Sequence, residues 1–287
     1  MEAIRFKDLT YIYQANSVMA QPALTKITTT FKQGATTAII GHTGSGKSTL
    51  MQLIDGLILP TAGSITLGDL TITNETPVKE LGKLRRLVGY VFQFPEKQLF
   101  AESVLDDVKF GPLNQGLSDE EAQERAQAAL EQLNFPLELL KHSPFELSGG
   151  QQRRVAIAGV LAMHPEILIL DEPTVGLDPE GQAELLTLVR DLQAQGLTIL
   201  IVTHQMEIVA QLADEVMVLN HGQLAFQGSS QDLFLQPDLL ADNHLRLPKA
   251  IQLATNLGQR GITWDGLPLT TAQLADQIIQ MWGDQDE

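Results

Sequence analysis

The chain has 287 residues, of which 44 % are hydrophobic and none is cysteine. This length suits one large domain or two smaller ones, the hydrophobic content excludes a disordered chain, and the lack of cysteine excludes disulfides and thiolate metal sites. A formal net charge of −16, from 19 Lys and Arg against 35 Asp and Glu, argues against binding to nucleic acid or to anionic lipid.

The N-terminal segments are predicted to be strands. Apolar residues recur at strand spacing over residues 4–9 and 27–31, and the apolar run at 38–40 leads into a glycine. Residues 63–73 predict two more short strands joined by a tight turn at Gly68. The first residues lack a signal-peptide core and no apolar run reaches the ~18 residues of a membrane span, so we expect a soluble intracellular protein.

Two helices are predicted in the middle of the chain. Ser118 and Glu121 have the spacing of a capping box at the start of an Ala-rich helix over residues 118–133. A second helical pattern covers residues 151–163. Both belong to a mainly helical insert at about 95–165, which we interpret as a subdomain.

The next segments indicate an α/β core of nucleotide-binding type. Unbroken apolar runs at 167–170 and 198–202 are typical of parallel strands buried on both faces, and a helix beginning at Asp178 lies between them. Strands that alternate with helices favour such a core. The proline pattern changes from about residue 231, and residues 231–287 predict an extension of short helices with apolar residues at Leu274, Ile278 and Trp282.

A glycine-rich loop separates the strand at 38–40 from a helical stretch at 49–54. The loop and the residue after it are Gly41, His42, Thr43, Gly44, Ser45, Gly46, Lys47, Ser48 and Thr49. The glycines let successive backbone N–H groups surround an anion, and the following helix adds positive charge at its N-terminus. Lys47 can reach the β- and γ-phosphates, and the Ser48 hydroxyl can hold Mg²⁺. The loop predicts binding of a nucleoside triphosphate; a glycine-rich turn is the structural alternative.

Acidic residues end the strand at 167–170, where ligands of open α/β sheets bind. We expect Asp171 to bind Mg²⁺ together with Ser48, and Glu172 to polarise the attacking water. His204 follows the next strand and would lie beside the same γ-phosphate. The structural alternatives are a charged strand end and a surface histidine.

A second anion site is predicted at the start of the helix at 151–163. Its residues are Ser148, Gly149, Gly150 and Gln151. A hydroxyl and bare backbone N–H groups point out of this helix start, yet the chain has one triphosphate loop. Both facts agree if each subunit closes its helix on the triphosphate held by its neighbour, in a two-fold or pseudo-two-fold dimer. A turn without a ligand is the alternative.

Taken together, these segments resemble an ABC-transporter ATPase over residues 1–230. The resemblance is carried by Gly41–Ser48, Gln93, Leu147–Gln151, Asp171, Glu172, Gly176–Asp178 and His204. It implies a P-loop NTPase core of α/β class, with an antiparallel β subdomain, the helical subdomain at 95–165 and a small dimer-stabilising extension at 231–287. ATP and Mg²⁺ are the implied ligands.

The resemblance also assigns roles to single residues. It implies that Lys47 acts with Glu172 and His204 in catalysis, and that Tyr13 stacks on the adenine, with Tyr11 as the rival. Gln93 would bind Mg²⁺ and couple the nucleotide site to a membrane partner. Asp178 would contact the neighbour's ATP across the dimer seam, together with the four residues of the second anion site.

The segment after Gln93 narrows the resemblance to the energy-coupling factor vitamin importers and their cobalt or nickel relatives. The residues implied in coupling to the membrane partner are Gln93, Pro95, Glu96, Gln98, Leu99 and Phe100. Val175 departs from the alanine that is frequent in that group. We predict that the region 96–109 forms the groove for the partner's helices; an apolar segment that packs internally is the alternative.

The implied partners are a second ABC ATPase subunit, either a paralogue or a second copy, a transmembrane coupling subunit and small substrate-binding membrane subunits. The chain itself would be peripheral, on the cytoplasmic face of the cell membrane, and would not bind nucleic acid. Alternatives are a dedicated cobalt or nickel importer, a soluble ABC ATPase acting on DNA or ribosomes, and a regulatory module without turnover. Glu172 and His204 argue against the last of these.

Overall fold

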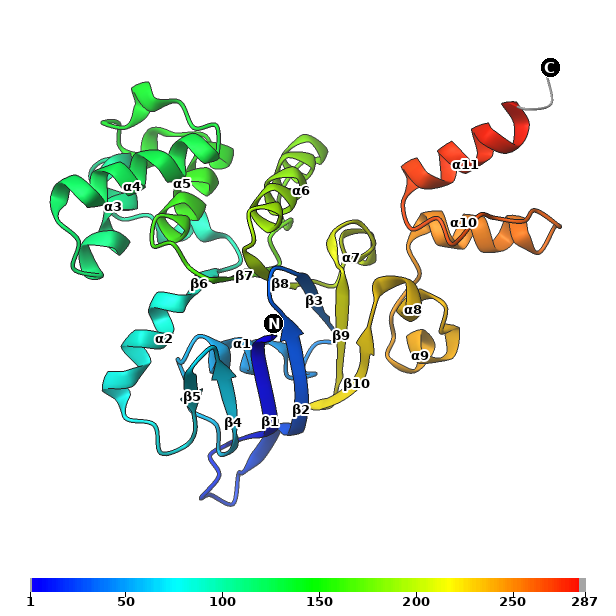
Figure 1. Cartoon of the computed structure of the whole chain (residues 1–287), viewed down its shortest axis with the longest axis horizontal. Coiled ribbons are helices and arrows are strands. Elements are labelled where there is room, and N and C mark those ends of the chain that lie inside the picture. Colours follow the sequence, from blue (N-terminus) through cyan, green and yellow to red (C-terminus); the bar gives the residue numbers. More distant parts are fainter. Residues whose placement is uncertain (1, 284–287) are drawn as a thin grey trace.

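The computed structural model describes residues 2–283 and contains two β-sheets, a group of helices beside them and a C-terminal helical arm (Figure 1). The strands are β1 (Glu2–Tyr13), β2 (Gln21–Lys32), β3 (Thr36–Ile40), β4 (Ala62–Leu67), β5 (Leu70–Ile72), β6 (Val88–Val91), β7 (Ile167–Asp171), β8 (Thr198–Val202), β9 (Glu215–Asn220) and β10 (Gln223–Gly228). The α-helices are α1 (Lys47–Ile54), α2 (Leu81–Leu87), α3 (Val104–Asn114), α4 (Asp119–Gln132), α5 (Gly149–Leu161), α6 (Pro179–Ala194), α7 (Met206–Leu212), α8 (Ser230–Phe234), α9 (Pro237–Asp242), α10 (Lys249–Gly258) and α11 (Thr271–Gly283).

The larger sheet has the strand order β10-β9-β3-β8-β7-β6, and its strands from β9 to β6 are parallel. β3 and β8 are buried along their whole length, which explains their aliphatic and β-branched sequences. Because parallel strands end at the same edge, the segments after β3, β7 and β8 meet there. This confirms the predicted α/β core and brings the glycine-rich loop, Glu172 and His204 to one edge.

The smaller sheet is antiparallel, with the order β2-β1-β4-β5. Phe6 of β1 and Phe31 of β2 meet edge to face, with ring centroids 5.3 Å apart. Both belong to a buried cluster that also contains Leu50 and Leu53 of α1 and Leu200 of β8. Helix α1 is therefore held between the two sheets, which fixes the loop that precedes it. The predicted strand pair at 63–73 is present as β4 and β5.

Helices α3, α4 and α5 form the group beside the larger sheet (Figure 1). The predicted capping box begins α4, where the Ser118 hydroxyl accepts from the backbone N–H of Glu121 and the Glu121 carboxylate accepts from that of Ser118. Buried Val108, Leu130 and Ala158, one from each helix, belong to the same cluster as the sheet residues of β7 and β8. The helices thus share a core with the nucleotide-type sheet.

The C-terminal region begins as part of the core and ends as an arm. Phe234 and Leu240 pack in one cluster with Ala38 and Val218 of the sheet. Farther along, α10 and α11 contact each other through a small cluster centred on Ala254 and Leu274 and project away from the sheets (Figure 1). The expected boundary at 230/231 falls at the start of α8 (Ser230–Phe234). The side chain of Trp282 lies outside the described residues.

The sequence patterns did not predict α2, β6, α7, β9 and β10. β6 has four residues and contains Gly89, where a Cβ atom would lie 2.6 Å from Val160 of α5. The close approach of α5 leaves no room for a side chain at position 89, which explains a glycine there although glycine disfavours strands. Within residues 2–283, no helix is both long enough and apolar enough to cross a bilayer.

Candidate functional site

The loop between β3 and α1 is shaped by glycines whose backbone angles other residues rarely adopt. The φ angles of Gly41, Gly44 and Gly46 are +147°, +82° and +107°. A Cβ atom on Gly41 would lie 2.2 Å from the carbonyl oxygen of Leu219 in β9, so only glycine fits there. A Cβ atom on Gly44 would meet nothing within 4 Å. The loop is thus tight on the sheet side and open on the other, as an anion-binding loop requires.

Lys47 folds back onto this loop. Its Nζ donates hydrogen bonds to the carbonyl oxygens of Gly41, at 2.7 Å, and His42, at 3.0 Å. Burial lowers the pKa of Lys47, whereas the carboxylates of Glu172 and Asp171 raise it. The ammonium group therefore lies within electrostatic reach of both predicted acids. A partly desolvated cation of this kind is stabilised by an anionic ligand.

The other predicted nucleotide-binding residues surround the start of α1. The Tyr13 hydroxyl is hydrogen-bonded to that of Thr49 at 3.1 Å, and the Tyr13 side chain is 40 % exposed. Tyr11 meets Tyr13 edge-on, with ring centroids 4.9 Å apart, but packs against the buried cluster between the sheets. Of the two tyrosines, Tyr13 is the more accessible to a ligand. The exposed loop residues are Thr43, Gly44 and Ser48. The Ser45 hydroxyl is buried without a hydrogen-bond partner among the described residues.

Asp171, the last residue of β7, is oriented by a neighbouring strand. The Tyr90 hydroxyl on β6 donates to Asp171 Oδ2 at 3.1 Å. Burial raises the pKa of Asp171, while the Tyr90 hydrogen bond and the charge of Lys47 lower it. Burial also raises the pKa of Tyr90, so its hydroxyl remains a donor. Asp171 is therefore a positioned carboxylate at the sheet edge.

Glu172 is held in a strained turn directly after β7. Its φ angle is +47°, and its backbone N–H donates to the carbonyl of Val202 at 2.8 Å. The side chain lies 2.7 Å from His204, between Oε1 and Nδ1, and Oε2 accepts a weak 3.4 Å hydrogen bond from Thr203. The structure thus joins the predicted base to the predicted histidine. A left-handed residue that is not glycine is typical of functional sites.

Gln93 follows β6 on the same edge. Val91, the last residue of β6, is paired with Leu170 of β7, so the segment after it leaves the sheet beside Asp171. Gln93 is exposed, and Phe94 turns the chain with a φ of +57°. For a metal ion, the edge therefore offers the Asp171 carboxylate, the Gln93 amide and the Ser48 hydroxyl as oxygen ligands. This donor set suits Mg²⁺, which takes few protein ligands and completes its coordination with water and phosphate.

The second predicted anion site lies apart from the loop. Ser148 caps α5: its hydroxyl accepts from the backbone N–H of Gln151, and the Gln151 side chain accepts from the backbone N–H of Ser148. Cβ atoms on Gly149 and Gly150 would meet nothing within 4 Å, and both glycines are exposed. Together with Asp178, the N-cap of α6, they line a pocket of about 390 Å³ that contains no residue of the glycine-rich loop. Within one chain, the two predicted anion-binding surfaces are therefore separate.

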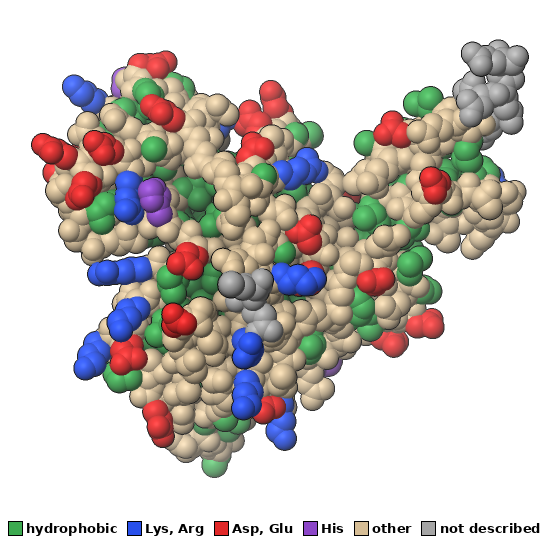
Figure 2. Space-filling view, in the orientation of Figure 1, with side chains coloured by type: hydrophobic (Ala, Val, Ile, Leu, Met, Phe, Trp, Pro, Cys, Tyr) green, Lys and Arg blue, Asp and Glu red, His purple; other side chains and the backbone are tan. Residues whose placement is uncertain are grey.

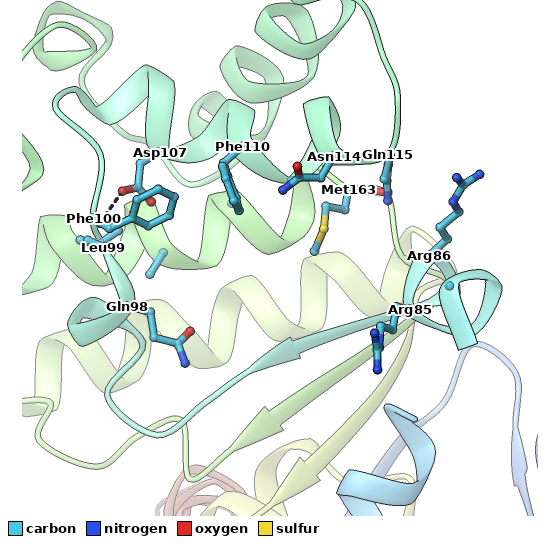
Figure 3. Close-up of a pocket in the computed structure, with 14 residues that line it drawn as sticks. Arg85, Arg86, Gln98, Leu99, Phe100, Asp107, Phe110, Asn114, Gln115 and Met163 are labelled. Atoms are coloured by element: carbon cyan, nitrogen blue, oxygen red, sulfur yellow. Dashed lines mark hydrogen bonds between the residues drawn. The ribbon is translucent and has the colours of Figure 1, made fainter. Parts of the chain in front are cut away.

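A larger groove of about 690 Å³ lies between α2 and the helices α3 and α5 (Figure 3). Phe100 and Phe110 form an edge-to-face pair there, with centroids 4.8 Å apart, and both are at least half exposed. The Asp107 carboxylate accepts from the backbone N–H groups of Phe100 and Ala101, both at 2.9 Å, and fixes this wall. The groove thus presents a rigid aromatic surface.

The predicted coupling residues divide between two places. Gln98, Leu99 and Phe100 line the groove, whereas Pro95 is buried and Glu96 points to an arginine of α5. Arg85 and Arg86 of α2 line the groove as well, and Figure 2 shows Lys and Arg side chains gathered over α2. The acidity of the whole chain therefore does not describe the charge of this groove.

Sequence reasoning missed three residues that the structure places around these sites. Tyr90 holds Asp171, Arg85 donates to the carbonyl of Gly56 at the end of α1, and Arg153 binds Glu96. Their partners lie 29 to 81 positions away in the chain. For Arg153, the sequence offered one signal: it lies two residues after Gln151, next to the predicted second anion site. For Tyr90 and Arg85 the sequence offered no comparable signal.

Comparison with known proteins gives consistent matches. Residues 24–175 match the family described as ABC transporter. The energy-coupling factor transporter ATP-binding protein EcfA2 of Enterococcus faecalis is 49 % identical over 96 % of both chains. That of Streptococcus thermophilus is 46 % identical over 96 % of this chain and 99 % of its own.

Solved structures agree. cbiO1 from Clostridium perfringens, described as part of the ABC transporter complex cbiONQ, has a TM-score of 0.74 and 38 % identity, covering 88 % of this chain and 99 % of its own. The ATP-binding cassette MJ0796, in a dimeric post-hydrolysis state bound to ADP and Pi, has a TM-score of 0.69 and 31 % identity, covering 79 % and 98 %.

Proposed function

This chain belongs to the ABC transporter family as an ATP-binding ATPase subunit, and we propose that it is the motor of an energy-coupling factor importer. Relatives that carry the energy-coupling factor name match it over nearly their whole length. The structural observation that carries the proposal is the groove, because its Gln98–Phe100 wall follows directly after Gln93 at the nucleotide edge. One short segment thus joins the ATP site to a docking surface.

We assign ATP binding to the glycine-rich loop, with Tyr13 as the adenine platform. Lys47 would exchange its loop carbonyls for the β- and γ-phosphates, since a partly buried ammonium gains from a charged partner. Mg²⁺ would be held by Ser48, Asp171 and Gln93, and when bound it neutralises charge that develops on the phosphates. Tyr90 keeps Asp171 turned toward that place.

Glu172 and His204 are assigned to hydrolysis. Glu172 would accept a proton from the water whose oxygen attacks the γ-phosphorus, and the bond to the ADP oxygen would break. His204 contacts the Glu172 carboxylate at 2.7 Å and so fixes its orientation at the strand edge. The strained backbone of Glu172, held by Val202, serves the same end.

A complete site needs a second ATPase subunit, either a paralogue or another copy. The loop and the Ser148–Gln151 helix start are separate within the chain, so the helix start is free to cover a neighbour's phosphates. Asp178 lines the same pocket and would reach the seam. The structural similarity to a dimeric ABC cassette supports this arrangement. The C-terminal arm of α10 and α11 would add contacts that hold the pair together.

The groove is assigned to the helices of a transmembrane coupling subunit, which would place this chain peripherally on the cytoplasmic face of the membrane. Its aromatic pair supplies apolar area, and Arg85 with Asp107 supplies polar groups at its rim. Separate small membrane subunits would then select the substrate, a vitamin or related micronutrient. Nothing in the nucleotide site needs to contact it.

The test is a tagged purification from detergent-solubilised membranes of the native host, followed by mass spectrometry of the partners. We expect a second ATPase, one coupling membrane protein and several small substrate-binding membrane proteins. Recovery of soluble or nucleic-acid-bound partners alone would contradict the transporter assignment. The matched control is the same chain with Phe110→Asp in the groove, which should lose the membrane proteins.

A second candidate is the ATPase of a dedicated cobalt or nickel importer. The similarity to cbiO1, part of the complex cbiONQ, favours it. The same purification distinguishes the two, because a dedicated importer would yield a single fixed set of membrane subunits instead of several interchangeable ones.

A further inference from the structure

Arg153, in the second turn of α5, uses its guanidinium group to bind segments outside its own helix. Nε donates to Glu96 Oε2 at 3.1 Å, and Nη2 lies 3.4 Å from Glu96 Oε1. Nη1 and Nη2 each donate to the carbonyl oxygen of Val175 at 3.2 Å, and Nη1 also reaches that of Pro173 at 3.4 Å. The residue is 7 % exposed. All three guanidinium nitrogens are therefore hydrogen-bonded, and the group is almost fully shielded from solvent.

The two segments that Arg153 joins have different tasks in the proposed function. Glu96 lies in the 3₁₀ turn Pro95–Gln98, whose last residue lines the docking groove. Pro173 and Val175 follow Glu172 directly and lead to Asp178, the cap of α6. Arg153 thus contacts both the turn that leads into the groove wall and the loop behind the assigned base.

A second contact supports the idea that these segments move as one body. Phe94 packs on Gly176, where a Cβ atom would lie 3.4 Å from the Phe94 ring. Lys97 lies over the same ring, with its Nζ 4.7 Å from the Phe94 ring centroid. The turn after Gln93 and the loop after Glu172 are therefore in contact both through Arg153 and through an aromatic ring.

We propose that Arg153 is a positioning residue that transmits the occupancy of the groove to the loop carrying Glu172 and Asp178. A displacement of the Pro95–Gln98 turn by a docked helix would move Glu96, and the guanidinium would carry that movement to the Pro173 and Val175 carbonyls. The planar fork of arginine holds a carboxylate and a carbonyl at fixed relative angles, which lysine cannot do. The inference rests on the proposed function, since it requires a partner in the groove.

The hydrogen-bond network around Arg153 has few ways to be partly formed. A buried guanidinium that loses its carboxylate keeps an uncompensated charge, so the network moves or breaks as a unit. By contrast, the neighbouring Arg154 makes an exposed ion pair with Glu184 of α6, at 2.6 Å, and among the described residues it has no hydrogen bond to the turn or to the loop. Arg154 is therefore a matched control on the same helix.

The experiment uses the whole importer, reconstituted in liposomes with its membrane subunits. We measure ATP hydrolysis and substrate uptake for Arg153→Met, Arg153→Lys, Glu96→Gln and the control Arg154→Met, after checking co-purification and thermal unfolding of each. We expect Arg153→Met to assemble and hydrolyse ATP but to lower the uptake per ATP by about two- to thirtyfold, the range of residues that modulate coupling. Arg153→Lys should recover only part of that ratio.

The controls and the double variant sharpen the test. Arg154→Met should keep the wild-type ratio of uptake to hydrolysis. Arg153→Met with Glu96→Gln should be no worse than Arg153→Met alone, because the two side chains act through one contact. If Arg153→Met unfolds, Glu96→Gln alone still tests the contact, with a smaller loss of the ratio expected.

Two results would overturn the inference. The first is a normal uptake-to-hydrolysis ratio in both Arg153→Met and Glu96→Gln. The second is equal loss of uptake and hydrolysis in Arg153→Met with full rescue by Arg153→Lys, which would mean that only a buried positive charge matters. Failure of the proposed function looks different, because the wild-type chain would then neither assemble with membrane subunits nor support uptake.

Discussion

The nucleotide edge and the docking groove are built in opposite ways. The loop at Gly41–Ser48 is shaped mainly by backbone angles within one strand–loop–helix unit, with one close approach from Leu219 of β9. The groove is assembled from side chains of α2, α3 and α5, which are far apart in sequence, and it leaves Phe100 and Phe110 largely exposed. A site for a small anion can be encoded locally, whereas a surface for a protein helix requires the fold.

The two regions also differ in what they need from other chains. The glycine-rich loop, Asp171 and Glu172 are positioned by residues of this chain. By contrast, Gly149 and Gly150 are exposed, and a Cβ atom on either would meet nothing within 4 Å in this chain. Under the proposed function, the chain supplies one half of a nucleotide site and a separate docking surface. The predictions below separate these parts by changing one and measuring the other.

The largest effect is expected from the base. Glu172→Gln keeps the size of the side chain and a hydrogen bond to His204 but removes the proton acceptor. We expect ATP hydrolysis to fall by about 10²–10⁴-fold, the contribution of a positioned general base. ATP binding and ATP-driven dimerisation, followed by size-exclusion chromatography, should persist. Turnover close to that of the wild type would remove Glu172 from this role.

The next effect tests the predicted contact with the neighbour's ATP. Gly150→Ala adds a methyl group that meets nothing within this chain, and alanine in a helix stabilises by up to about 1 kcal/mol relative to glycine. Hydrolysis should nevertheless fall by about 10- to 100-fold, because the methyl group would displace the partner's phosphates. Thermal unfolding and nucleotide binding by the monomer serve as controls. Unchanged hydrolysis would mean that this helix start faces solvent in the working dimer.

A third change breaks the groove and spares the nucleotide edge. Phe110→Asp places a charge on the aromatic wall, and binding to the membrane coupling subunit should weaken by about 10- to 30-fold, as for other interface anchors. Phe145→Asp is the matched control, because Phe145 is 64 % exposed and does not line the groove. Quantitative co-purification measures both. ATPase activity of the detached chain should be the same in the two variants.

The same division explains how much could be predicted from the sequence. The capping box at Ser118, the strands β3 and β8 and the glycine-rich loop were predictable, since each depends on residues that are neighbours in the chain. That Glu172 and His204 lie at the same edge followed from one further rule, that parallel strands end together, whereas their direct hydrogen bond was not predicted.

What escaped prediction depends on pairing between distant segments. β6 is a strand because it pairs with β7, although Gly89 interrupts its pattern. β10 is the exception, because it pairs with the adjacent β9, but it is an edge strand whose mixed burial gives no clear alternation. Glu96 was expected to face a membrane partner, yet it binds Arg153, 57 positions away. Composition and periodicity carry no information about such partners, and the groove volume between α2 and α5 follows only from the packed fold.

The smallest predicted effect concerns the ionisation of Asp55, which lies where the nucleotide helix α1 approaches the groove residue Arg85. Asp55 ends α1, and Arg85, which lines the groove, donates to the carbonyl of the adjacent Gly56. Burial raises the pKa of Asp55 from 3.8 to about 6, and the charge of Arg85 offsets this only in part. The folded chain therefore binds this proton more tightly than the unfolded chain does. Stability should fall as the pH rises from about 4 to 6 and stay lower above that.

Asp55→Asn removes this ionisation and tests which influence dominates. At about pH 7.5 the variant should gain about 1–2 kcal/mol in unfolding free energy, a value reduced from the full shift because the site is partly exposed, and near pH 4 the gain should vanish. Denaturant titrations at both pH values measure it, with the exposed turn residue changed as Asp69→Asn for comparison. A loss of stability at the higher pH would show instead that the attraction between Asp55 and Arg85 outweighs the burial of the carboxylate. Helix α1 and the groove would then be coupled by the charge of Arg85, separately from the contacts that Arg153 makes to the loop after Glu172.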